Sequence, residues 1–216
     1  MSDPDLELQR QQMLRVQLRR RGIHDPRVLA AMARTPRERF LPEGLRSQAY
    51  ADRALPIACN QTISQPYIVA LMSQALGLSG GESVLEIGTG SGYQAAVLAE
   101  LAREVVTVER HAELSQQAGR VLEELGYRNV TCLSGDGTLG WKDRSPYDRI
   151  MVTAAALQVP PALLEQLGEG GVMVIPLGPP DHQVLQAIRK VSGRPSPTSL
   201  AACRFVPLVR ADGEPA

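Results

Sequence analysis

The sequence of 216 residues predicts an α/β fold with a mostly parallel central sheet, helices on both faces and a helical N-terminal extension. Short apolar runs that suit buried strands alternate with helix-forming segments from residue 84 onward, as expected for repeated strand–helix units. A glycine-rich turn joins the first of these strands to its helix. Residues 5–21 have the apolar spacing of an amphipathic helix, which predicts the extension.

Start and stop signals divide this extension into helices. Residues 5–21 should form one helix that ends at Gly22. Asp25 is a suitable N-cap for a second helix, because Pro26 follows it at the first helical position. A third, short helix is expected to begin at Thr35.

A polar loop lies ahead of the first strand of the sheet. Residues 50–57 are too irregular in sequence to predict a helix or a strand. The loop 60–67 leads into an apolar helix that ends at Gly77, with Ser64 as the expected N-cap and Pro66 in the first turn. Because the loop immediately precedes the first strand, it can fold over that strand's carboxyl end, where ligands bind in open α/β sheets.

The remaining elements are predicted from apolar runs bounded by turn residues. Strands are expected at 84–87, 105–108, 130–133, 147–152 and 172–175. Helices are expected at 94–99, 112–125 and 160–168. A late antiparallel pair of strands is expected at 184–191 and 201–209. The alternation of strands and helices predicts a parallel sheet for all but this last pair.

The first strand runs directly into glycines at positions 88, 90 and 92. Glycine permits a positive φ and carries no Cβ, so a ligand can lie against the backbone of this turn. The spacing is G-x-G-x-G rather than the G-x-G-x-x-G of dinucleotide-binding folds. The buried carboxylate of Glu86 needs a partner, and an ammonium group or hydroxyls suit it better than a pyrophosphate. This pattern is typical of motif I in Rossmann-like S-adenosylmethionine-dependent methyltransferases, although glycine-rich turns also occur as plain structure.

Acidic residues follow two further strands. Glu109 lies at about the interval after the turn where a carboxylate accepts hydrogen bonds from ribose hydroxyls. Its alternative role is a surface acid beside Arg110. Asp136 could accept a hydrogen bond from an adenine amino group, or it could be an ordinary turn aspartate. Since the carboxyl ends of parallel strands meet at one edge of a sheet, these acids should lie near one ligand.

Composition narrows the classes of partner. The formal net charge is zero, so no binding of nucleic acid or of a membrane surface is predicted. The three cysteines are widely separated, and neither a disulfide framework nor a metal site is expected. Residues 1–12 lack the apolar stretch of a signal peptide, so we expect a cytoplasmic protein. We expect a single domain over 1–216, with 5–60 as the extension and substrate-side loop and 61–210 as the core.

Several motifs together resemble the protein-L-isoaspartate O-methyltransferase family in its bacterial form. Residues 61–67 (QTISQPY) are similar to the family's substrate loop, which most other methyltransferases lack. Residues 84–93 (VLEIGTGSGY) resemble its motif I. The other similar blocks are 108–110 (VER), 135–137 (GDG), 147–156 (YDRIMVTAAA), 163–178 (LLEQLGEGGVMVIPLG) and 204–209 (RFVPLV).

The resemblance implies methyl transfer from S-adenosylmethionine to the free α-carboxylate of L-isoaspartyl residues in damaged proteins and peptides, which initiates their repair. No metal is implied, and we expect a monomer. The cofactor-binding residues that the resemblance implies are Gly88, Gly90, Glu109, Arg110, Gly135 and Asp136. From the end of the strand and the turn we also expect Glu86 and Thr89 to bind the cofactor. Ser64 matches the position that the family uses as its active-site serine. The implied substrate-binding residues are Thr62, Ile63, Val206, Pro207 and Leu208.

This chemistry requires no general base, because the attacking carboxylate is already ionised at neutral pH and the sulfonium methyl is activated by its charge. The protein's task would be to position the reactants and exclude water. Ser64 would orient the carboxylate by a hydrogen bond, act as a helix N-cap, or do both.

Two other interpretations stay open. One is an aspartate-methylating enzyme of a peptide-natural-product pathway, although such relatives usually carry extra C-terminal sequence and this chain stops at Ala216. The other is a nucleotide-binding module without methyltransferase activity, which the glycine spacing and the loop at 62–64 disfavour.

Overall fold

The computed structural model describes residues 4–216, and its first elements form the predicted helical extension. Helix α1 (Pro4–Gln12) continues into the π-helical η1 (Met13–Leu18) and the 3-10 turn η2 (Arg19–Arg21). The run ends at Gly22, whose φ of +92° is the left-handed conformation that glycine adopts without strain. The predicted helix and its stop are therefore confirmed.

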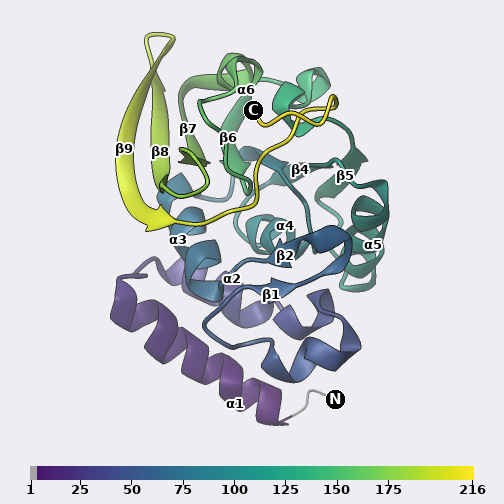
Figure 1. The fold of residues 1–216 in the computed structure, drawn as a ribbon. Helices are drawn as coiled ribbons and strands as arrows, with labels where there is room; N and C mark the ends of the chain where they lie inside the picture. Colours follow the sequence, from purple (N-terminus) through teal and green to yellow (C-terminus); the bar gives the residue numbers. More distant parts are fainter. Residues whose placement is uncertain (1–3) are drawn as a thin grey trace.

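The rest of the extension is built from shorter helices. Helix α2 (Pro26–Arg34) begins as predicted, because the Asp25 carboxylate accepts a hydrogen bond of 2.8 Å from a backbone N–H in the first turn. The third helix is η3 (Arg37–Phe40), a 3-10 turn, and η4 (Glu43–Gln48) follows it. Figure 1 shows these elements below the central sheet, on the side where the chain begins.

The loop ahead of the sheet is more regular than its sequence predicts. The two-residue strands β1 (Leu55–Pro56) and β2 (Thr62–Ile63) pair antiparallel, so the expectation of no element over 50–57 is wrong in part. Helix α3 (Pro66–Leu76) has Gln65 as its N-cap, without a side-chain cap bond. The prediction that Ser64 is the N-cap is wrong, because Pro66 takes the first helical position and Ser64 lies one residue too early.

A seven-stranded sheet forms the centre of the molecule, in the order β5-β4-β3-β6-β7-β8-β9. Its strands are β3 (Ser83–Ile87), β4 (Glu104–Glu109), β5 (Val130–Ser134), β6 (Tyr147–Val152), β7 (Leu167–Leu177), β8 (Gln183–Val191) and β9 (Arg194–Cys203). The five strands from β5 to β7 in this order are parallel to one another. Strand β8 pairs antiparallel with β7, and β9 pairs antiparallel with β8. The strand order reverses between β3 and β6, which opens a crevice at their carboxyl ends.

Helices cover both faces of this sheet. On one face, side chains such as Val84 and Val105 join a core with the extension, α3, α4 (Tyr93–Ala99) and α5 (Ala112–Glu124). On the other face, Leu85 and its neighbours pack with α6 (Pro161–Gln166) and with Leu208 of the C-terminal segment. The structure thus has the predicted mostly parallel sheet with helices on both faces and a helical N-terminal extension.

The last strands differ in position from the prediction. The partner of β8 is β9, at 194–203 rather than 201–209, and the turn between them is at Ser192 and Gly193. The sequence was misleading because Pro195 and Pro197 argue against a strand, yet β9 is an edge strand, where proline is tolerated. Beyond β9 the chain crosses to the carboxyl side of the parallel strands, as the yellow segment in Figure 1 shows.

The predicted helix 160–168 ends at Gln166, because the chain enters β7 at Leu167, beside Tyr147 of β6. Among the helices of residues 4–216, none is both long and apolar enough to cross a membrane.

Candidate active site

A cavity of about 310 Å³ lies at the carboxyl ends of β3, β4 and β6. Four segments that are distant in sequence form its walls: the loop 60–64, the glycine turn, the end of β4 and the C-terminal segment 206–209. Eleven of the residues predicted from sequence line it, namely Thr62, Ile63, Ser64, Gly88, Thr89, Gly90, Glu109, Arg110, Val206, Pro207 and Leu208. Glu86, Gly135 and Asp136 lie outside the lining.

The glycine turn presents bare backbone to the cavity. Gly88 has a φ of +95°, and a Cβ there would collide with the Thr153 hydroxyl. That hydroxyl donates to the Gly88 carbonyl at 2.6 Å, while the Gly88 N–H donates to the Val108 carbonyl at 2.8 Å. Any side chain at position 88 would therefore break the contact between Thr153 and the turn.

Glu109, the last residue of β4, is 5% exposed and reaches the cavity through the tip of its side chain. One carboxylate oxygen accepts the Gly90 N–H at 2.9 Å, and the other accepts the His111 N–H at 3.0 Å. These two bonds fix the orientation of the carboxylate. Each oxygen keeps a free lone pair, so the two carboxylate oxygens can still accept hydrogen bonds from two neighbouring hydroxyls of a ligand.

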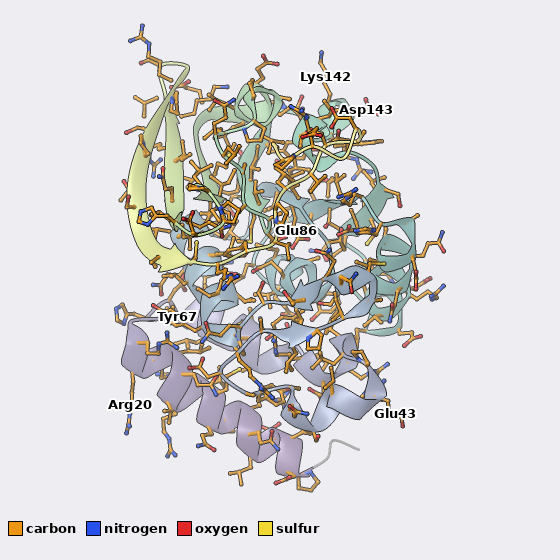
Figure 2. All side chains as sticks on the ribbon, viewed as in Figure 1. Arg20, Glu43, Tyr67, Glu86, Lys142 and Asp143 are labelled. Atoms are coloured by element: carbon orange, nitrogen blue, oxygen red, sulfur yellow. The ribbon has the colours of Figure 1, made fainter. Side chains whose placement is uncertain are left out.

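Glu86 is fully buried in β3, and Figure 2 labels it near the centre of the molecule. Its Oε2 accepts the Thr107 hydroxyl at 2.6 Å, and Thr107 in turn lies 2.6 Å from the Thr89 hydroxyl. Oε1 is buried and has no hydrogen-bond partner among residues 4–216. Burial raises the pKa of Glu86 to about 8, and Glu109 adds to the rise, although the bond from Thr107 opposes it.

Thr107 was missed by sequence reasoning. Strand pairing sets it directly opposite Glu86, and this register is not visible in either strand alone. The chain Thr89–Thr107–Glu86 links a residue of the cavity wall to a buried carboxyl group that keeps one unsatisfied oxygen.

Asp136 is used by the protein itself. Its Oδ1 accepts the Thr138 N–H and hydroxyl at 2.9 and 2.7 Å, and its Oδ2 accepts the Ala211 N–H at 2.8 Å. Partial burial would raise its pKa, but these hydrogen bonds outweigh burial and lower it. Asp136 thus caps the short 3-10 turn η6 (Gly137–Leu139) and attaches the C-terminal tail to it, while Gly137 rather than Gly135 lines the cavity.

The substrate-side residues come from opposite ends of the chain. Thr62 and Ile63 are in β2, and Ser64 follows them, half-buried, with no hydrogen bond from its hydroxyl to any residue in the range 4–216. The segment 206–208 is held by Ala155, whose N–H donates to the Val206 carbonyl at 2.8 Å and whose carbonyl accepts the Leu208 N–H at 2.7 Å.

Further lining residues were not singled out from sequence. They include Asn60, Tyr93 and His111. Asn60 has a φ of +55°, a conformation that asparagine tolerates better than most residues, so its type was a weak signal for a tight turn. Within residues 4–216, no group of three or more His, Cys, Asp or Glu side chains is placed to hold a metal ion.

Comparisons with known proteins identify the family of the chain. The sequence model of the protein-L-isoaspartate(D-aspartate) O-methyltransferase family matches residues 9–213. The protein-L-isoaspartate O-methyltransferase of Koribacter versatilis is 52% identical over 98% of this chain and 97% of its own length. That of Dictyoglomus turgidum is 53% identical over 95% of this chain and 93% of its own.

Solved structures are similar as well. One protein-L-isoaspartate O-methyltransferase gives a TM-score of 0.83 at 33% identity, with 91% of this chain matched to 65% of that chain. A second solved structure, from Plasmodium falciparum, is described as a candidate protein-L-isoaspartate O-methyltransferase in complex with S-adenosyl-L-homocysteine. Its TM-score is 0.77 at 25% identity, and the match covers 91% of this chain and 96% of that chain. The chain therefore belongs to the protein-L-isoaspartate(D-aspartate) O-methyltransferase family.

Proposed function

We propose that the cavity is the place where this chain transfers a methyl group from S-adenosylmethionine to the α-carboxylate of an isoaspartyl residue in a damaged protein or peptide. The chain is an S-adenosylmethionine-dependent carboxyl methyltransferase of the protein-repair type. The observation that supports this assignment of the cavity is that it unites the glycine turn and Glu109 with the loop 62–64.

The residues present fit the cofactor. The bare turn at Gly88 and Gly90 leaves room for a ligand against the backbone, and the Glu109 carboxylate can accept from a vicinal diol. Glu86 is fully buried and outside the cavity lining, so it would act on the cofactor side through the hydroxyls of Thr107 and Thr89. Thr89 and Arg110 line the same side of the cavity. The family resemblance adds Gly135 and Asp136 to the proposed cofactor residues. S-adenosylmethionine supplies the activated methyl group on a positively charged sulfur.

The substrate side then has to position an anion. The α-carboxylate of an isoaspartyl residue is ionised at neutral pH, so no residue has to remove a proton from it. The Ser64 hydroxyl has no partner within residues 4–216 and is free to donate to that carboxylate. Thr62 and Ile63 on one wall, and Val206, Pro207 and Leu208 on another, would enclose the substrate and exclude water.

The direct test uses two peptides of the same sequence, one with an aspartyl and one with an isoaspartyl residue. Incubation with S-adenosylmethionine should add a methyl group to the isoaspartyl peptide alone, as detected by mass spectrometry. Methylation of the ordinary aspartyl peptide would favour the natural-product alternative. No methylation of either peptide, with the cofactor bound, would contradict the proposed function.

Ser64→Ala should lower kcat/KM for the isoaspartyl peptide by at least about tenfold, roughly the value of one hydrogen bond to a charged group. Because Gln65 rather than Ser64 caps α3, the substitution should leave the unfolding temperature nearly unchanged. Steady-state kinetics and thermal unfolding on the same variant separate a role of Ser64 in orienting the substrate from a role in stabilising the start of α3.

Ser47→Ala is the matched control, since Ser47 is exposed on η4 and lies outside the cavity lining. Ser47→Ala should leave both kcat/KM and the unfolding temperature unchanged. Ser64→Ala should not alter the affinity for S-adenosylhomocysteine. Unchanged kinetics in Ser64→Ala would remove Ser64 from the mechanism without affecting the family assignment.

Treatment with a metal chelator should leave the activity unchanged. The nucleophile is already charged and the methyl group is already activated, so the proposed chemistry has no step that needs a Lewis acid. Activity measured before and after chelation, with and without added divalent ions, tests this. Loss of activity that a divalent ion restores would contradict the positioning mechanism.

We also propose that the protein is a monomer with a single domain. The extension and the sheet share one core, in which Met13 and Val28 join Val84. The exposed large apolar side chains among residues 4–216 lie in separate segments of the chain, at Leu8, Leu139, Leu157 and Val191. Light scattering coupled to size exclusion should therefore give the mass of one chain.

A further inference from the structure

Arg37, in the 3-10 turn η3, is a fully buried arginine directly behind the substrate side of the cavity. Its Nε donates to the Ala49 carbonyl at 2.7 Å, and one terminal nitrogen donates to the Ser64 carbonyl, also at 2.7 Å. The guanidinium carbon lies 4.8 Å from the centre of the Tyr93 ring. Ser64 and Tyr93 both line the cavity, so the charged group contacts two of its wall residues from behind.

This charge has no carboxylate partner. None of the ion pairs within residues 4–216 involves Arg37, and its other terminal nitrogen is buried without a hydrogen-bond partner. Burial lowers the pKa of Arg37 to about 10, which still leaves the guanidinium charged at neutral pH. Within residues 4–216 this buried charge contacts carbonyls and the Tyr93 side chain but no carboxylate, which is costly for the free protein. An anion bound nearby would reduce that cost.

The proposed function supplies such an anion at the right place. A carboxylate that accepts the Ser64 hydroxyl would lie within one residue of the carbonyl that Arg37 holds. Between them lie protein atoms rather than bulk water, so the attraction is screened less than on a surface. The segment that carries Ser64 is also fixed by the same guanidinium.

We propose that Arg37 is a positioning residue for the substrate, which fixes the Ser64 backbone and gives this side of the cavity a positive potential that selects an ionised α-carboxylate over a neutral group. The inference rests on the proposed function, because it assumes that the isoaspartyl α-carboxylate binds at Ser64. It goes further in assigning charge selectivity to a residue that never touches the substrate.

A purely structural role would also weaken substrate binding, so the test must separate charge from folding. Two isoaspartyl peptides serve as probes, one with the free α-carboxylate and one in which this group is a carboxamide. Their dissociation constants are measured by calorimetry on the complex with S-adenosylhomocysteine. The preference of each protein for the carboxylate is the dissociation constant of the carboxamide peptide divided by that of the carboxylate peptide.

The wild-type protein should prefer the carboxylate by at least about tenfold. Arg37→Gln should lose most of this preference, while its affinity for S-adenosylhomocysteine stays within about twofold of wild type. Arg37→Lys should keep part of the preference, because it retains the charge without the forked geometry. Arg39→Gln is the matched control, since Arg39 lies on the same turn but is exposed and paired with Glu124. It should behave as wild type.

Arg37→Met fills a similar volume without polar atoms, and it replaces Arg37→Gln if the latter does not fold. A folded neutral variant that keeps the full preference would overturn the inference, even if both of its affinities fall equally. A folded Arg37→Lys that loses the whole preference would also overturn it. If the wild-type protein binds neither peptide, the proposed function fails first, which is a distinguishable result.

Discussion

Glu109→Ala should weaken the binding of S-adenosylhomocysteine by at least about 30-fold, the equivalent of roughly 2 kcal/mol. The substitution removes both oxygens that can accept from the ribose hydroxyls. It also leaves the N–H groups of Gly90 and His111 without the acceptors that they have at 2.9 and 3.0 Å. Both effects act on the cofactor side of the cavity, so the loss should appear in affinity, as measured by isothermal titration calorimetry.

Two comparisons assign the loss to the hydroxyls. Glu104→Ala, at the other end of β4, removes a partly exposed acid paired with Arg103 and should leave the affinity unchanged. An analogue of S-adenosylhomocysteine without ribose hydroxyls should bind to wild type much more weakly than S-adenosylhomocysteine itself. Its affinity should be nearly the same for wild type and for Glu109→Ala. If the analogue discriminates between the two proteins as strongly as the natural ligand does, Glu109 supports the turn and does not bind the diol.

Much of the fold could be predicted because its signals are local. The run 84–87 is apolar and ends in glycine, and both features follow from where the strand lies: buried on two faces and followed by a turn with positive φ. The start of α2 was predicted from Asp25 and Pro26 for the same reason, since the cap bond spans two residues. The position of β9 was not predictable in this way, because prolines are excluded from central strands but allowed on an edge.

The parts of the site that sequence reasoning missed depend on contacts between distant residues. Thr107 bonds to Glu86 only because β3 and β4 pair in one particular register. Arg37 reaches Ser64 across 27 residues, and nothing around position 37 distinguishes it from the exposed arginines of the same extension. Ala211 binds Asp136 over 75 residues, so the role of this aspartate as an anchor for the tail is visible only in the folded chain.

In the cofactor-free protein, Glu86→Gln should become more stable relative to wild type as the pH rises. The folded-state pKa of Glu86 is raised to about 8 from the ordinary 4.5, chiefly by burial. Between these values the folded protein holds a proton that the unfolded chain has lost, so the stability of wild type falls by about 1.4 kcal/mol per pH unit. This contribution is fully present below the unfolded pKa and is lost as the pH rises through 8. Glutamine does not titrate, so its variant lacks this slope.

The difference in unfolding free energy between Glu86→Gln and wild type should therefore grow by roughly 3–4 kcal/mol from about pH 5.5 to about pH 8.5, as measured by urea unfolding. Glu82→Gln is the control from the start of the same sheet. Hydrogen bonds from Ser79 and Gly80 outweigh partial burial and lower the pKa of Glu82 to about 2, so it is ionised in both states over this range. Its difference from wild type should stay constant. A constant difference for Glu86→Gln as well would mean that the Glu86 carboxylate is ionised in the folded protein, and that an unseen partner satisfies its second oxygen.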